Sequence, residues 1–116
     1  MAENKKTGDY GEKLAISFLC EKEYEILETN FRCRTGEIDI IARNGGYYIF
    51  FEVKLRKSLK MGYPREAVGH LKQNKIKKAA LFWLMKNRIG HADMRFDVIE
   101  ILHMDNITIE HIENAF

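Results

Sequence analysis

The stretch from residue 36 to residue 56 constrains the fold most, because its pattern is that of a hairpin made of two buried strands. It reads "GEIDIIARNGGYYIFFEVKLR", and both runs are rich in β-branched and aromatic residues. Asn44, Gly45 and Gly46 separate the two runs. Asn-Gly and Gly-Gly pairs in this position are typical of a tight β-hairpin turn. The chain is therefore expected to contain two antiparallel strands that meet at these glycines.

Four charged residues interrupt the apolar runs: Glu37, Asp39, Glu52 and Lys54. Side chains alternate between the two faces of a strand, so Glu52 and Lys54 share one face. A two-residue turn of the glycines places Asp39 directly opposite Glu52. The same register places Glu37 opposite Lys54. A turn one residue earlier would make Asp39 the diagonal neighbour of Glu52, and a three-residue loop would break the match unless a bulge restored it.

Two opposed carboxylates need an opposing charge. With Cβ atoms about 5 Å apart they repel by roughly 3 kcal/mol at an effective dielectric constant near 20. A shared proton or an arginine would offset the repulsion, but a divalent cation does so most directly. Magnesium binds few protein carboxylates and leaves its other positions to water and substrate phosphate. Asp39 and Glu52 therefore predict a metal site, with Lys54 close enough to orient or deprotonate an attacking water.

The same charged residues have a plainer interpretation, in which they form the polar face of a solvated hairpin. Glu37 and Lys54 would then be a cross-strand ion pair. However, Ile41, Tyr48 and Phe50 would share that face. Because this face is not simply polar, the pattern favours a site.

Charge is unevenly distributed along the chain, although the net charge is only +2. Residues 54–88 hold 11 Lys and Arg residues against 1 acidic residue, whereas residues 1–53 hold 7 against 10 and residues 89–116 hold 1 against 6. Such a basic block either solvates one face of a helix or binds a polyanion.

Residues 65–88 show the spacing of an amphipathic helix, with Gly69 near its start and Gly90 just past its end. Its apolar side is expected to carry Val68, Leu71, Ile76, Ala79, Ala80, Trp83 and Leu84. Its basic side carries Lys72, Lys75, Lys77 and Lys78. Trp83 and Phe82 are expected to pack in the core rather than stack on bases. A row of lysines beside a metal site would hold phosphates, and a solvated helix face is the alternative.

A first helix is predicted for residues 9–23, where apolar residues recur at helical spacing. Asp9 would cap its N-terminus, and Glu12 would complete a capping box. Three further strands are predicted, at residues 25–32, 94–102 and 106–112. The resulting order, αβββαββ, is that of one α/β domain spanning residues 1–116.

Several other kinds of site are not supported by the sequence. Cys20 and Cys33 are too few for a zinc site or a disulfide framework, so two reduced thiols are expected. The four histidines lack metal-ligand spacing. Arg95 and Asp97 are expected to form an internal ion pair. No run approaches the roughly 18 apolar residues of a membrane span, and the N-terminus lacks the apolar core of a secretory signal, so a cytoplasmic protein is expected.

Five segments of the chain, taken in order, resemble a known family: "GEIDIIA", "IFFEVKLR", "GYPREAV", "KQNKIKKAA" and "RFDVIEI". They resemble the YraN-type family of uncharacterised bacterial proteins, which is regarded as a family of predicted endonucleases. Through that family the chain is similar to the PD-(D/E)xK nucleases of restriction-endonuclease-like fold, especially the small Holliday-junction resolvases. The resemblance runs from about Gly8 to Ile101. It implies an αβββαβ core in which a mixed sheet is flanked by helices, here with an extra C-terminal strand.

The resemblance also implies roles for the matching positions. Asp39, Glu52 and Lys54 match the two acids and the lysine of the motif. The ligands of Mg²⁺ or Mn²⁺ would be Asp39, Glu52, the backbone carbonyl of Val53 and Glu12. Gln73 matches a polar position that often faces the site and joins the catalytic group.

Further positions would support the reaction or bind the substrate. Glu37 matches a supporting position. The nucleic-acid-binding residues would be Arg56, Lys72, Lys75, Lys77 and Lys78.

These expectations combine into one main hypothesis, a metal-dependent nuclease that hydrolyses phosphodiester bonds in nucleic acid. DNA is the expected substrate, with branched or nicked structures included. A non-catalytic nucleic-acid-binding module on a nuclease scaffold is one alternative. The other is an interaction subunit of a DNA-processing assembly. A homodimer is compatible with the resemblance, because resolvase-like enzymes often work as dimers.

Overall fold

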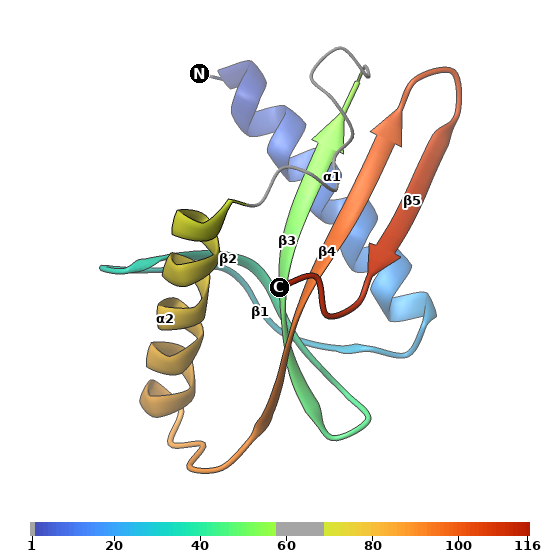
Figure 1. The fold of residues 1–116 in the computed structure, drawn as a ribbon. Coiled ribbons are helices and arrows are strands. Elements are labelled where there is room, and N and C mark those ends of the chain that lie inside the picture. Colours follow the sequence, from blue (N-terminus) through green and yellow to red (C-terminus); the bar gives the residue numbers. More distant parts are fainter. Residues whose placement is uncertain (1, 58–68) are drawn as a thin grey trace.

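The computed structural model describes residues 2–57 and 69–116, with side chains from residue 9 onward in these ranges. Within them the chain forms two helices and five strands (Figure 1). In chain order these are α1 (Ala2–Glu21), β1 (Glu25–Cys33), β2 (Gly36–Asn44), β3 (Tyr47–Arg56), α2 (His70–Lys86), β4 (Asp93–His103) and β5 (Ile107–Ile112). The predicted order αβββαββ is confirmed.

The strands form one mixed sheet in the order β1-β2-β3-β4-β5. β3 and β4 run parallel, and the other neighbours are antiparallel. α2 lies on one face of the sheet and α1 crosses the other (Figure 1). The mixed sheet flanked by helices, with β5 as an extra C-terminal strand, is therefore as expected. Within the described residues, no helix is long and apolar enough to cross a membrane.

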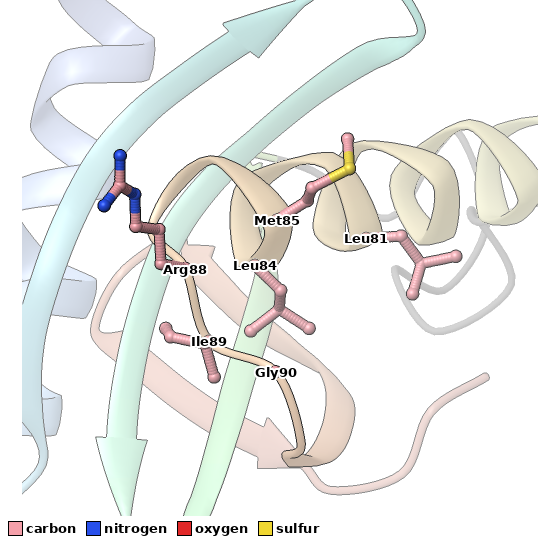
Figure 2. Close-up of a pocket in the computed structure, with 6 residues that line it drawn as sticks. All are labelled: Leu81, Leu84, Met85, Arg88, Ile89 and Gly90. Carbon is pink, nitrogen blue, oxygen red and sulfur yellow. The ribbon is translucent and has the colours of Figure 1, made fainter.

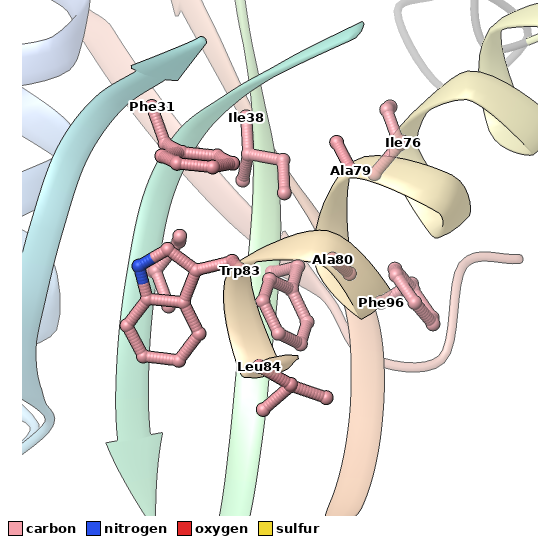
Figure 3. Close-up of a cluster of buried hydrophobic side chains, with 10 residues drawn as sticks. Phe31, Ile38, Ile76, Ala79, Ala80, Trp83, Leu84 and Phe96 are labelled. Carbon is pink, nitrogen blue, oxygen red and sulfur yellow. The ribbon is translucent and has the colours of Figure 1, made fainter. Parts of the chain in front are cut away.

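Two apolar clusters, one on each face of the sheet, hold the helices in place. The α2-side cluster comprises Phe31, Ile38, Ile41, Phe50, Phe96, Ile76, Ala79, Ala80, Trp83 and Leu84 (Figure 3). The α1-side cluster comprises Ala15, Leu19, Ile40, Ala42, Ile49, Phe51, Ile99 and Ile101. Trp83 also donates a hydrogen bond from Nε1 to Glu28 on β1, at 2.8 Å. Each helix is thus fixed against the strands that carry the charged hairpin.

The first helix begins earlier than predicted. Since α1 starts at Ala2, Asp9 lies inside the helix and cannot cap it, so the predicted cap is wrong. The residues between Ala2 and Asp9 include good helix formers such as Glu3, Lys5 and Lys6. These residues favour extension of the helix toward the N-terminus.

The second helix is shorter than predicted, and fewer of its apolar residues are buried than expected. It begins at His70 with Gly69 at the N-cap, while Pro64 and Val68 lie outside the described residues. Trp83 is buried, as expected. Leu71 is 80% exposed and Phe82 is 43% exposed, so both predictions of core packing are wrong. Leu71 lies in the first turn, beyond the part of the helix that packs in the cluster.

Arg95 and Asp97 form the predicted internal ion pair. The guanidinium donates to both carboxylate oxygens at 2.9 to 3.1 Å, and Asp97 is fully buried. Asp97 also lies 2.6 Å from His111 Nε2 and accepts a hydrogen bond from the Asn114 backbone at 3.1 Å. Burial opposes the charge, but the hydrogen bonds of His111 and Arg95 outweigh it and lower the pKa of Asp97. This network ties β4 to β5 and to the C-terminal residues.

Replacing Asp97 with Asn should destabilise the protein by about 3 kcal/mol, because Arg95 loses its buried counter-charge. Since the folded-state pKa of Asp97 is lowered, its contribution is present above about pH 4 and is lost as the pH falls below that value. Urea unfolding at pH 7 and pH 3 should therefore show a smaller difference between variant and wild type at pH 3. The exposed Asp93→Asn on the same strand is the control, and an equal difference at both pH values would contradict this account.

Candidate metal and phosphate site

The hairpin turn consists of Gly45 and Gly46, whose φ angles are 57° and 86°. Both values lie in the left-handed region that glycine adopts without a steric penalty. Asn44 pairs with Tyr47 across the turn. The two-residue turn, and with it the register that aligns Asp39 with Glu52, is confirmed.

β2 and β3 separate at Asp39. Their pairing runs from the turn to Ile40 opposite Phe51. One residue further, the Asp39 carboxylate accepts a hydrogen bond from the Val53 backbone N–H, with 2.7 Å between Oδ2 and the nitrogen. The side chain takes the place of a strand partner, and β2 turns away with β1 while β3 continues beside β4 (Figure 1). Asp39 therefore lies at the point where the sheet opens, in line with Glu52.

Glu52 and Lys54 lie on the α2 face of the sheet. Phe50 packs in the α2-side cluster, and alternation puts the next two even-numbered residues on the same side. Glu52 is 6% exposed, and its Oε1 lies 2.5 Å from Lys72 Nζ on the first turn of α2. The same oxygen lies 3.5 Å from Lys54 Nζ. Two lysines from different elements thus neutralise one buried carboxylate.

The environment shifts the pKa values of these groups. Burial and the neighbouring Glu52 charge raise the pKa of Asp39 from 3.8 to about 7. Burial lowers the pKa of Lys54, although Glu52 opposes this effect. Burial also disfavours the charge of Lys72, but the hydrogen bond to Glu52 outweighs it and raises the pKa of Lys72. Asp39 and Lys54 can therefore exchange protons closer to neutral pH than an ordinary acid and lysine.

Three further polar residues are neighbours of these groups in the sequence or in the sheet register. Gln73 is half-buried beside Lys72 on α2. Arg56 is half-buried and lies two residues beyond Lys54 on the same face of β3. Glu100 on β4 is 6% exposed and lies opposite Lys54 in the parallel register. Glu100 could not be predicted from the sequence, because the alternation in "RFDVIEI" gives its face but not its register against β3.

Glu37 and Glu12 have partners other than those predicted. Glu37 pairs with Arg32 on β1, with 3.1 Å between Oε2 and Nε, and both side chains are mostly exposed. The expected pairing of Glu37 with Lys54 is wrong, because β2 leaves β3 before reaching that position. Glu12 accepts a hydrogen bond from Asn30 Nδ2 at 2.8 Å and is not part of a capping box, since α1 begins ten residues earlier.

The predicted row of lysines is divided between two sides of α2. Lys72 and Lys75 line a cavity of about 380 Å³ beside Gly36, at the start of β2. Lys77 lies on the other side, with Nζ 5.9 Å from the centre of the Phe96 ring. The prediction of a single basic strip is therefore wrong for Lys77, which faces β4.

Arg32, near the end of β1, and Arg34, in the β1–β2 turn, extend the basic surface. Arg34 and Lys78 line a cavity of about 350 Å³, and Arg32, Arg34 and Lys75 line another of about 330 Å³. The turn and the helix can approach closely because Gly36 has no Cβ. A Cβ at this position would lie only 3.0 Å from the Lys75 carbonyl oxygen. Sequence reasoning missed these arginines, because their closeness to α2 depends on tertiary packing.

Two other features of the described residues are poorer candidates for the site. A cavity of about 430 Å³ at the C-terminal end of α2 is lined mainly by apolar side chains (Figure 2). It lies at the opposite end of the helix from Lys72. Asp97, His111 and Glu113 bring metal-ligand atoms within 4.8 Å of one another, but Arg95 already forms ion pairs with both acids.

Comparison with known proteins identifies the family. A family model described as "Uncharacterised protein family UPF0102" matches residues 11–101. The chain belongs to the UPF0102 family. The matched segment contains α1 from Gly11 onward, the charged hairpin, α2 and most of β4. The expected family membership is therefore confirmed.

Relatives in this family align over nearly the whole chain. A UPF0102 protein of Geobacter metallireducens is 53% identical over 114 residues, covering 97% of this chain and 93% of the relative. One from Geotalea daltonii is 50% identical over 116 residues, covering 98% and 91%. One from Clostridioides difficile is 46% identical over 113 residues, covering 97% and 98%.

Replacing Asp39 with Asn should stabilise the metal-free protein at pH 8. The folded-state pKa of Asp39 is raised to about 7, whereas its pKa in the unfolded chain is about 4. The unfolded chain therefore releases this proton at a lower pH than the folded protein does. As a result, the stability of wild type falls as the pH rises from about 4 to 7. The melting temperature of Asp39→Asn in EDTA should therefore exceed that of wild type at pH 8, and the excess should be smaller at pH 5.

The exposed Glu25→Gln, at the start of β1, is the matched control and should melt like wild type at both pH values. A melting temperature of Asp39→Asn below that of wild type at pH 8 would contradict the electrostatic strain assigned to Asp39.

Proposed function

We propose that this protein is a metal-dependent nuclease that hydrolyses phosphodiester bonds in nucleic acid. The observation that carries the proposal is the alignment of Asp39 with Glu52 where β2 leaves β3, next to Lys54 and Lys72. Two acids and a lysine in this arrangement can hold a divalent cation and activate water at one place. Membership of UPF0102 is compatible with this function.

The residues fit Mg²⁺ or Mn²⁺. Mg²⁺ is bound by one or two carboxylates and fills its remaining positions with water and substrate phosphate oxygens. Asp39 and Glu52 supply two carboxylates from different strands. The raised pKa of Asp39 reflects its burial and its repulsion from Glu52, and a cation would relieve the repulsion. The Val53 carbonyl and Glu12 are the further ligands proposed. The bound cation would neutralise charge at the scissile phosphate.

The two lysines have different proposed tasks. Lys54 is 13% exposed and its pKa is lowered, so it can orient an attacking water and accept its proton. Lys72 is more exposed, at 47%, and lies on the first turn of α2. Once a cation binds Glu52, Lys72 can turn to a substrate phosphate. Gln73 follows Lys72 on α2, and the charge of Arg56 acts on Lys54; both would contact the substrate.

The proposed substrate is DNA, including branched or nicked structures. Lys75, Lys78 and Arg34 form a basic surface that continues from Lys72 along α2 and the β1–β2 turn. Contacts of this kind bind the phosphate backbone without reading bases, so they favour recognition by shape.

A cleavage panel tests the proposal. Linear duplex, nicked duplex, single-stranded and four-way-junction DNA are incubated with Mg²⁺, Mn²⁺ or EDTA, and cleavage of at least one substrate with metal is expected. Lys54→Ala should lower the rate about 10²- to 10⁴-fold, because the water loses its proton acceptor. Asp39→Asn and Glu52→Gln should lower it at least as much.

Glu25→Gln is the control for the panel, because Glu25 is an exposed acid at the start of β1, at the opposite end of that strand from the β1–β2 turn. No cleavage of any substrate with either metal, or unchanged rates in all three variants, would refute the nuclease function.

A non-catalytic nucleic-acid-binding module is the second candidate. One observation favours it: the ammonium groups of Lys72 and Lys54 can neutralise Glu52 in place of a metal ion. This candidate predicts DNA binding that survives EDTA and Glu52→Gln, with no product from any substrate. An interaction subunit of a DNA-processing assembly predicts instead no DNA affinity at low salt.

The basic surface should determine the salt dependence of DNA binding. Lys75→Ala and Lys78→Ala should each reduce the slope of log K against log salt concentration by about 0.9, because each removes one phosphate contact with duplex DNA. Fluorescence anisotropy in EDTA measures the slope without cleavage. Lys13→Ala, on the opposite face of the sheet, should leave it unchanged. An equal slope in wild type, Lys75→Ala and Lys78→Ala would show that DNA does not bind there.

A further inference from the structure

An exposed apolar patch lies on α2, one to two turns beyond Lys78. It consists of Leu81, Phe82 and Met85, and Figure 2 shows Leu81 and Met85 on this helix. Their exposed fractions range from 43% to 70%. A surface helix normally buries such side chains in the stripe that faces the core. Contiguous exposed patches are typical of binding surfaces, so this one calls for a ligand.

The same three side chains line the cavity of about 350 Å³ between α2 and the β1–β2 turn. This volume lies within the range of roughly 300 to 1,000 Å³ that is usual for small-ligand sites. Arg34 from the turn and Lys78 from the helix also line it. The cavity therefore combines apolar walls with two cations, and it suits a ligand that has both an apolar ring and a negative charge.

The Phe82 ring is supported by a buried ring beneath it. It stacks on Phe31 of β1, with 6.3 Å between the ring centroids and 27° between the ring planes. Phe31 is 4% exposed and belongs to the α2-side cluster (Figure 3). Phe82 thus extends a stack that begins in the core, while part of its own ring stays exposed. Aromatic rings presented in this way are those on which unpaired bases stack.

A row of cavities joins Phe82 to the candidate metal site. Arg34 lines both the 350 Å³ cavity and the 330 Å³ cavity, and Lys75 lines both the latter and the 380 Å³ cavity beside Lys72. Residues three and four positions apart share a helix face, and those on this face are Lys72, Lys75, Lys78 and Phe82. Phe82 lies about 15 Å along the helix axis from Lys72. This distance corresponds to roughly four stacked nucleotides at about 3.4 Å each.

We propose that the 350 Å³ cavity binds an unpaired nucleobase of the DNA substrate, stacked on Phe82. The inference rests on the proposed function, since it specifies the substrate as DNA with a single-stranded segment a few nucleotides from the scissile phosphate. The phosphates of that segment lie along the lysines of α2. Every base has a π-face, so stacking here accepts any sequence.

Charge complementarity favours this occupant over a second copy of the chain, which is the alternative for an exposed apolar patch. Arg34 and Lys78 beside the cavity pair with the phosphates of a nucleotide, and the row of lysines continues that pairing toward Lys72. A second copy that placed the same patch against this one would bring these cations close to their own counterparts, and like charges repel.

DNA binding in EDTA, measured by fluorescence anisotropy, tests the proposal with the wild-type chain. The probes are a blunt duplex, the same duplex with a single-stranded overhang of either polarity, and the same overhangs with abasic sites in place of the bases. Abasic sites keep the phosphates and remove the stacking. Wild type should bind a normal overhang at least about fivefold more tightly than its abasic counterpart, the lower end of the contribution of one stacked base. Equal binding of normal and abasic overhangs would overturn the proposal.

Two substitutions of Phe82 separate stacking from general apolar contact. Phe82→Leu keeps an apolar side chain without a ring and should remove the preference for the normal overhang. Phe82→Trp keeps a ring and should retain the preference. Tyr47→Leu is the matched control, because Tyr47 is another exposed aromatic residue, 42% exposed at the start of β3, and it should behave like wild type. A preference that survives Phe82→Leu would show that the base does not stack there.

Alkylation of Cys33 locates the bound base without any substitution. Cys33 lines the cavity and is partly exposed, whereas the exposed Cys20 lies on α1. A normal overhang should slow the reaction of Cys33 with iodoacetamide more than an abasic overhang does, and it should leave Cys20 unaffected, as measured by mass spectrometry. Protection of Cys33 that rises with protein concentration in the absence of DNA would show that a second copy covers the cavity, and the proposal would fail.

Cleavage separates this inference from the proposed function. If wild type cleaves DNA with metal but binds normal and abasic overhangs equally, the nuclease function stands and only the base site fails. If wild type prefers the normal overhang but cleaves no substrate, the base site stands and the nuclease function fails.

Discussion

The hydrogen bond from the Val53 backbone to the Asp39 carboxylate is the interaction on which the rest of the site depends. A buried strand must satisfy its N–H groups, and β3 loses its β2 partner beyond Phe51. Asp39 supplies the missing acceptor at 2.7 Å, so β2 can turn away while β3 stays paired with β4 as far as Arg56. The sheet therefore opens without leaving this amide unsatisfied, and the opening lies between the two acids.

Electrostatic strain is concentrated at this opening. Burial and the neighbouring Glu52 charge raise the pKa of Asp39 to about 7, while Glu52 depends on two lysines for its neutralisation. One of them, Lys72, is positioned by contacts that α2 makes elsewhere along its length. The α2-side cluster and the hydrogen bond of Trp83 to Glu28 fix the helix, and its first turn then reaches Glu52. A protein selected only for stability would not need such a pair of acids, and groups of this kind are typical of functional sites.

The features that could be predicted from sequence are those that depend on local periodicity. The glycine turn fixed the hairpin register, and alternation then put Glu52 and Lys54 on one face. Features that depend on tertiary geometry could not be predicted. The register of Glu100 against Lys54 arises from a parallel crossover, and the closeness of Arg34 to α2 arises from packing at Gly36.

The wrong predictions have both local and tertiary origins. Asp9 has the residue type of a cap, but the helix formers before it extend α1 to Ala2. Leu71 matches the apolar spacing of α2 but lies in its first turn, before the buried residues of the helix begin at Ile76, and it is 80% exposed. The left-handed backbone of Asn30 on β1, with a φ angle of 53°, was not predicted, because asparagine is also common in ordinary turns.

The central claim, that Asp39 and Glu52 together bind a divalent cation, can be tested most directly by anomalous diffraction from crystals grown with Mn²⁺. The account predicts an anomalous peak within bonding distance of both carboxylates, with the Lys72 ammonium displaced from the Glu52 oxygen that it contacts in the metal-free protein. A structure with Mn²⁺ in the crystal but no peak between these two acids, and with Lys72 still bound to Glu52, would contradict it.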